Sequence, residues 1–109
     1  MYELTDRQYA KNIRKADPDA FAAYTAYHEE VLRGDSSPLD ARTTEMIALG
    51  VAFTTQCPHC IHSHSVAARS AGVTEEELAR VIHIASALRS GGAMTHGMVA
   101  WKFFDEDAG

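Results

Sequence analysis

Two cysteines three positions apart are the residues of this chain best suited to redox chemistry. They stand in the segment Cys57-Pro58-His59-Cys60 and are the only cysteines among the 109 residues. Pro58 fits the first turn of a helix, so Cys57 is predicted at its N-cap, where unpaired backbone N–H groups and the helix dipole favour a thiolate. Cysteines so placed can have a thiol pKa well below its usual range. One sulfur can then attack a substrate and the other can resolve the adduct, although such a pair can equally be half of a zinc site.

A histidine and a glutamate at matching spacings can complete a proton relay with these thiols. His64 follows Cys60 by four residues, so both side chains share one helix face about 5–6 Å apart. A tight turn near residues 54–56 predicts that the helices on either side run antiparallel, which brings Glu45 within one turn of His64. A carboxylate there can orient the imidazole, as the acidic member of a catalytic triad does. The four residues Glu45, Cys57, Cys60 and His64 are therefore predicted to form one site.

The elements that carry these residues are predicted to be helices. Several segments repeat apolar residues at helical spacing, and no segment alternates long enough for a half-buried strand. Capping and stop signals predict helices at residues 6–15, 18–33, 41–55, 58–71 and 75–89, the first of them from the pair Thr5 and Gln8. Gly91 and Gly92 predict a break before a sixth helix, and an acidic frayed end is predicted from residue 105. The sequence therefore predicts an all-α fold.

Composition and charge narrow the possible functions. The length fits a single domain over residues 1–109, and so small a domain favours self-association because one chain buries limited surface. The net charge of -5, with scattered lysines and arginines, argues against nucleic-acid and membrane partners. The polar first ten residues lack a signal-peptide core, and two cysteines are too few for a secreted disulfide framework. A cytoplasmic location is therefore expected.

The spacing of the site residues is similar to that of a known family. Glu45, the Cys57 to Cys60 segment and His64 together resemble the AhpD-like alkylhydroperoxidases, within the carboxymuconolactone decarboxylase superfamily. The likeness covers the hairpin from about Leu39 to Gly72 and continues into the segment at 73–78. It implies an AhpD-like fold of about six helices, whose central antiparallel hairpin carries the cysteine pair, and it implies trimers or hexamers.

The resemblance also implies an activity and a role for each site residue. Cys60 would be the peroxidatic cysteine and Cys57 its partner, with His59, His64 and Glu45 relaying protons. The substrate would be a hydroperoxide or a partner disulfide, such as that of a peroxiredoxin. Electrons would come from a thiol partner such as a lipoyl protein or a thioredoxin, with no bound cofactor or metal. The decarboxylase branch of the superfamily lacks this cysteine pair, so its presence argues against decarboxylation.

Two alternatives stay open at this stage. A zinc site could use both cysteines and His64, with His62 or Glu45 as the fourth ligand. A decarboxylase or lactone-processing activity would need cations around an acidic substrate, and the hairpin offers few beyond Arg42 and Arg69. The remaining histidines and the apolar stripe of the last helix are predicted to belong to core or interface: His83, His96, Met94, Met98, Trp101 and Phe104.

Overall fold

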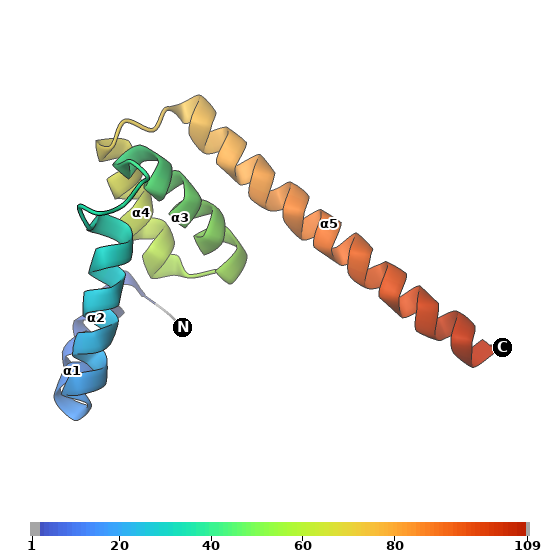
Figure 1. Cartoon of the computed structure of the whole chain (residues 1–109), viewed down its shortest axis with the longest axis horizontal. Helices are drawn as coiled ribbons and strands as arrows, with labels where there is room; N and C mark the ends of the chain where they lie inside the picture. Colours follow the sequence, from blue (N-terminus) through green and yellow to red (C-terminus); the bar gives the residue numbers. More distant parts are fainter. Residues whose placement is uncertain (1–2, 109) are drawn as a thin grey trace.

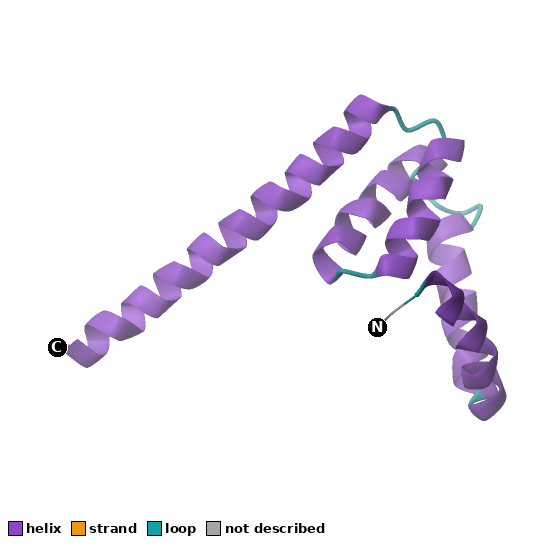
Figure 2. Ribbon diagram, turned by 180° about the vertical axis from the view of Figure 1, so that it is seen from behind, coloured by secondary structure: helices purple, strands orange, loops and turns teal. Residues whose placement is uncertain are grey.

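Helices joined by short loops make up most of residues 3–108, which are the residues that the computed structural model describes (Figures 1 and 2). The all-α prediction is confirmed, and the number of helices is close to the six expected. In chain order they are the 3-10 helix η1 (Leu4–Tyr9), α1 (Ala10–Ala16), α2 (Pro18–Arg33), α3 (Ala41–Thr55), α4 (Pro58–Ser70) and α5 (Glu75–Ala108).

Local capping signals fix most helix ends where the sequence predicts them. Asp17 and Asp40 each accept a hydrogen bond from the backbone N–H three residues on, and so begin α2 and α3. Thr74 and Glu77 form the predicted reciprocal capping box before α5. Beyond α4, Gly72 adopts a φ of +90°, a conformation that glycine adopts at little cost.

The N-terminal segment departs from the prediction of one helix over residues 6–15. A 3-10 helix occupies Leu4–Tyr9 and α1 follows directly. The turn begins earlier because the carboxylate of Asp6 accepts a hydrogen bond from the backbone N–H of Glu3 at 2.9 Å. The helix start is thus capped at Glu3, two residues before the capping box predicted from Thr5 and Gln8.

The predicted break at Gly91 and Gly92 is wrong, because α5 runs without interruption from Glu75 to Ala108. A glycine in a helix interior costs about 1 kcal/mol but keeps its N–H donor, so it weakens the helix without forbidding it. Only proline both removes the donor and clashes with the preceding turn, and α5 contains none. The acidic end predicted to fray from residue 105 is likewise helical through Ala108.

An antiparallel hairpin of α3 and α4 forms the centre of the fold, and α5 packs against α3 (Figure 1). Leu49 of α3 is fully buried, and the other buried apolar residues are small: Ala52, Ala68 and Ala85. Where α3 and α5 approach, a Cβ added at Gly50 would lie 3.8 Å from Val81 Cγ1. Of the residues that the structure describes as buried, all but Ala85 of α5 lie on the hairpin, which supplies a rigid frame for the side chains that it carries.

Candidate active site

The turn between α3 and α4 sets the relative position of the two hairpin helices. Gln56 ends α3 with a left-handed φ of 57°, and the backbone N–H of Cys57 donates to Ala52 O at 3.4 Å. Pro58 then opens α4 with its φ already suited to a helix. A reversal this short leaves little freedom in register, so positions on α3 and α4 face each other as counting along the helices predicts.

The two cysteines lie at the start of α4 and are joined as a disulfide, with their Cα atoms 5.2 Å apart. Cys57 is the N-cap residue, as predicted, and its Sγ accepts a hydrogen bond from the backbone N–H of Cys60 at 3.2 Å. Both residues are half-buried. The helix start therefore offers an N–H donor to a sulfur that carries negative charge when the bond is reduced.

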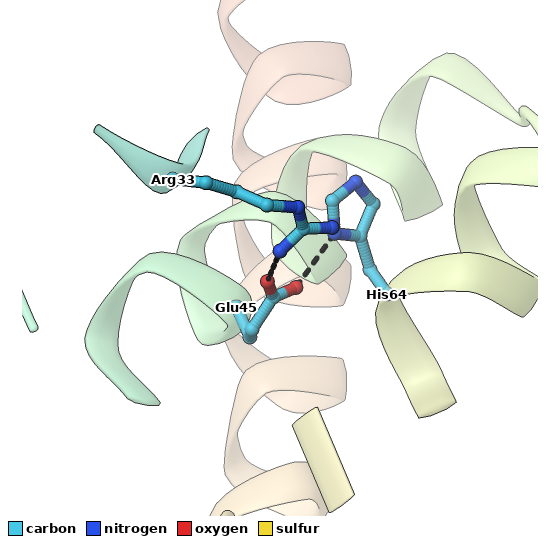
Figure 3. Close-up of polar contacts among 3 residues, drawn as sticks. All are labelled: Arg33, Glu45 and His64. Carbon is cyan, nitrogen blue, oxygen red and sulfur yellow. Dashed lines mark hydrogen bonds and ion pairs between the residues drawn. The ribbon is translucent and has the colours of Figure 1, made fainter. Parts of the chain in front are cut away.

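Glu45 of α3 and His64 of α4 form a buried hydrogen-bonded pair (Figure 3). Glu45 Oε2 lies 2.6 Å from His64 Nδ1, and the two side chains are only 4% and 10% exposed. An ionised carboxylate can only accept a hydrogen bond, so Nδ1 carries the proton of this contact. The neutral imidazole then keeps Nε2 free as an acceptor, which is the state that a general base requires.

Arg33, the last residue of α2, adds a cation to this pair and was not among the predicted site residues. Its Nη1 lies 3.5 Å from Glu45 Oε1, while Glu45 Oε2 faces the imidazole (Figure 3). The guanidinium offsets part of the carboxylate's charge at Oε1, the oxygen that is not the one bonded to His64. Its position could not be read from spacing, because the loop at residues 34–40 does not fix where the end of α2 lies.

An apolar cavity of about 430 Å³ lies between α2 and α3 and reaches the site. Cys60 and His64 both line it, and Cys57 does not. The remaining lining is mostly aliphatic and aromatic, with tyrosines 24 and 27 and His28 contributed by α2. A small organic molecule in this space would lie against Cys60 and His64 together.

The other histidines take different positions. His59 is half-buried, and its Nδ1 is a buried atom with no hydrogen-bond partner in the described part of the chain. It does not line the cavity, so its predicted place in the proton relay rests on the resemblance alone. His62 is exposed on α4, as are His83 and His96 on α5.

The geometry of the site favours neither a zinc site nor a decarboxylase. Among the described residues, no three or more His, Cys, Asp or Glu side chains gather in a metal-binding arrangement. Arg42 forms an ion pair with Glu77, and Arg69 lines a different depression beside Leu49 and Val73. The cavity that Cys60 lines therefore contains neither of the two arginines that a decarboxylase would need.

The family of the chain follows from comparison with known proteins. The sequence profile of the carboxymuconolactone decarboxylase family matches residues 18–102, so the chain belongs to this family. This confirms the resemblance at the family level. A Paracoccus denitrificans protein described as "Uncharacterized protein 4 in cox locus" is 40% identical over 88 residues, which are 81% of this chain and 75% of that protein. An uncharacterized Haemophilus influenzae protein is 42% identical over 53 residues, 49% of this chain and 45% of its own.

Within residues 3–108, no helix combines the length and the apolar character needed to cross a membrane.

Proposed function

We propose that this protein is a thiol-disulfide oxidoreductase that reduces a hydroperoxide, or the disulfide of a partner protein, through Cys57 and Cys60. One observation carries the proposal: a bonded cysteine pair opens the helix on which His64, held by buried Glu45, lines the same cavity as Cys60. Family membership is compatible with this chemistry, since the family includes AhpD-like proteins as well as lyases.

In the reduced protein, the first step is removal of the Cys60 proton. His64 lies one turn further along α4, so its free Nε2 can accept this proton directly or through one water. The imidazolium that forms lies against the Glu45 carboxylate, which stabilises its positive charge. Cys60 is left as a thiolate facing the cavity.

The thiolate then attacks the terminal oxygen of the peroxide. The S–O bond forms as the O–O bond breaks, and the departing alkoxide takes the proton from His64 to leave as an alcohol. Cys60 is now a sulfenic acid. The Cys57 sulfur attacks it, and water leaves as the disulfide forms. Two electrons have passed from the thiol pair to the peroxide, and an external dithiol restores the pair by exchange.

A labelling experiment on single-cysteine variants tests the proposal. With peroxide and a dimedone-type reagent, Cys57→Ser should be labelled at Cys60, because the attacking thiol is retained and the resolving thiol is gone. Cys60→Ser should not be labelled comparably at Cys57. Mild oxidation of the wild-type protein should remove two hydrogens by mass spectrometry, and a dithiol should restore them.

The result also distinguishes the rival chemistries. If both wild-type thiols still alkylate fully after peroxide treatment, the redox function is wrong. Labelling of Cys57 in Cys60→Ser, with Cys60 silent in Cys57→Ser, would reverse the order of attack. About one metal per chain, with thiols protected until a chelator is added, would support the zinc alternative. Turnover of a carboxylated lactone that survives Cys60→Ser would support the lyase.

The partners and setting are part of the same proposal. A lipoyl protein or a thioredoxin would serve as the reductant, and a peroxiredoxin is a candidate when the substrate is a disulfide. The protein is proposed to act in the cytoplasm, where a reducing environment keeps such a pair cycling, and to assemble into trimers or hexamers.

A further inference from the structure

The single chain exposes more surface than a folded monomer of its mass. Its accessible surface is 8632 Å² and its mass is 11.9 kDa, for which a compact monomer exposes about 6,000 Å². Its radius of gyration is 18.7 Å, where a compact domain of 109 residues has about 13 Å. The excess of about 2,600 Å² is of the order that one subunit buries in a large obligate interface.

One exposed part of the chain is residues 86–106 of α5, here called the arm. Every residue of the arm is exposed, and the helix projects away from the hairpin (Figure 1). Four large apolar side chains on it are each between 65% and 68% exposed: Met94, Met98, Trp101 and Phe104. A helix of this kind, carrying glycines 91, 92 and 97, gains its stability mainly from packing against another surface.

A second unpartnered apolar surface lies on α2. This helix has no buried residue, although Tyr24, Tyr27 and Val31 form a stripe on it that is 61%, 72% and 50% exposed. These side chains form one wall of the cavity that reaches Cys60 and His64. The opposite wall includes Ile47 of α3, which is 52% exposed. The cavity lined by Cys60 and His64 therefore has apolar walls that are exposed in the single chain.

The two surfaces cannot meet within one chain. In Figures 1 and 2, α2 and the arm lie on opposite sides of the α3–α4 hairpin, and the arm points away from it. Two copies can pair them, because each copy has both an arm and a cavity. In a reciprocal arrangement, the arm of each copy contacts the cavity of the other, so that two such contacts form and the buried area is doubled.

We propose that the arm of a second copy of this chain lies over the cavity between α2 and α3 and closes the site around Cys60 and His64. We infer that the occupant is a copy of the chain itself, because the arm and the α2 wall of the cavity both expose large apolar side chains. The excess accessible surface of the chain is also large enough for an obligate interface. Closure would exclude water from the site, which strengthens the interaction between Glu45 and a charged His64. The arm would thus supply part of the active site of its neighbour.

Photocrosslinking between isotopically distinct copies tests this placement without any use of the redox reaction. Unlabelled chains carry benzoylphenylalanine in place of Trp101, or in a second preparation in place of Phe104, and are mixed with ¹⁵N-labelled wild-type chains under conditions that allow exchange. After irradiation, mass spectrometry should find mixed-isotope crosslinks from the arm to cavity residues of α2 or α3. A second apolar cavity, of about 550 Å³, lies between α3 and α5 and is lined in part by Val81 and Leu88. Crosslinks confined to another arm, or to this second cavity, would overturn the proposal.

Matched charge substitutions provide a second measurement. Met98→Glu puts a carboxylate on the face shared with Met94 and Trp101, and should raise the dissociation constant at least about tenfold by sedimentation equilibrium. His96→Glu adds one carboxylate on the opposite side of the arm and should keep wild-type association. Trp101, the only tryptophan, should show blue-shifted, quencher-protected fluorescence in wild type and lose both in Met98→Glu.

The outcomes separate this inference from the proposed function. A wild-type chain that sediments as a monomer, with Trp101 fully accessible to quencher, would overturn the arm placement and leave the cysteine chemistry standing. Intermolecular crosslinks to the cavity in a protein whose cysteines never form a disulfide would support the arm placement and refute the proposed function.

Discussion

Replacing Glu45 by glutamine changes the charge of the buried pair while keeping its shape. The carboxylate accepts the Nδ1 proton of His64 at 2.6 Å in a setting where both side chains are at least nine-tenths buried. An amide can act there in two ways. Its NH₂ can donate to Nδ1, which moves the ring proton to Nε2 and leaves no acceptor for the Cys60 proton. Its carbonyl can instead accept from Nδ1, which keeps the tautomer and removes the negative charge.

The size of the effect follows from the distance. Two unit charges about 4 Å apart interact by about 4 kcal/mol at an effective dielectric constant near 20, which corresponds to roughly a thousandfold in rate. Arg33, 3.5 Å from Oε1, offsets part of this interaction. Positioned bases contribute roughly 10²–10⁴-fold to proton transfer. We therefore expect Glu45→Gln to slow oxidation of Cys60 by roughly 10²–10³-fold near neutral pH.

The assay uses the Cys57→Ser background, in which Cys60 is the only thiol. The second-order rate of sulfenic acid formation is measured by dimedone trapping with and without Glu45→Gln. Glu29→Gln is the matched control, because Glu29 lies exposed on α2 and its loss changes the net charge by the same amount. Urea unfolding of each variant shows whether folding is preserved.

A stability comparison separates the chemical role of Glu45 from a structural one. Glutamine can still hydrogen bond to His64, so Glu45→Gln should unfold near the wild-type urea midpoint. Glu45→Ala leaves a buried Nδ1 group without its partner and should lose about 1–3 kcal/mol. If Glu45→Gln and Glu29→Gln both react within threefold of the parent, the proton relay has no role in activating Cys60 and the reasoning is refuted.

Two further predictions concern the fold that holds this site. Leu49→Ala removes the one fully buried large side chain of the hairpin and should lower the free energy of unfolding by about 2–5 kcal/mol in urea, whereas a loss below about 1 kcal/mol would mean that the hairpin has no packed centre. Hydrogen bonds from Thr43, chiefly its backbone N–H, hold the pKa of the Asp40 carboxyl below its ordinary value of 3.8. The stabilisation this gives is present above that value and is lost as pH falls through the lower folded pKa, so the stability gap between wild type and Asp40→Asn should shrink with acid, and a gap independent of pH would contradict it.

The hairpin could be predicted from sequence because its determinants are local. Asp40 caps the first helix, Pro58 opens the second and Gly72 ends it, each through contacts within a few residues. Once two helices are joined by a tight turn, the rise of 1.5 Å per residue fixes which positions lie level. The contact between Glu45 and His64, nineteen residues apart, was predictable for this reason.

The features that could not be predicted depend on longer-range geometry or on weak preferences. Arg33 contacts Glu45 from the other side of the loop at residues 34–40. The sequence of such a loop does not predict the position of α2 relative to α3, so this contact could not be predicted. The break expected at Gly91 and Gly92 did not occur, since a propensity difference of about 1 kcal/mol per glycine is small beside the cooperativity of a long helix. His59 remains a site residue by resemblance only, because its buried Nδ1 has no hydrogen-bond partner within the described residues.

The placement of the two sulfurs suits a reaction with two different partners. On the proposed function, a small peroxide must reach one sulfur and a bulky thiol reductant must reach the pair afterwards. Cys60 lines the cavity and Cys57 does not, although the two are bonded and both are half-buried at the start of α4. A neighbouring arm over the cavity would bar a bulky reductant from Cys60, whereas the half-buried Cys57 does not line the cavity and would be the sulfur that the reductant attacks. Attack there would release Cys60 as the leaving thiolate, next to the same His64 that first took its proton, so one buried Glu45–His64 pair serves both halves of the cycle.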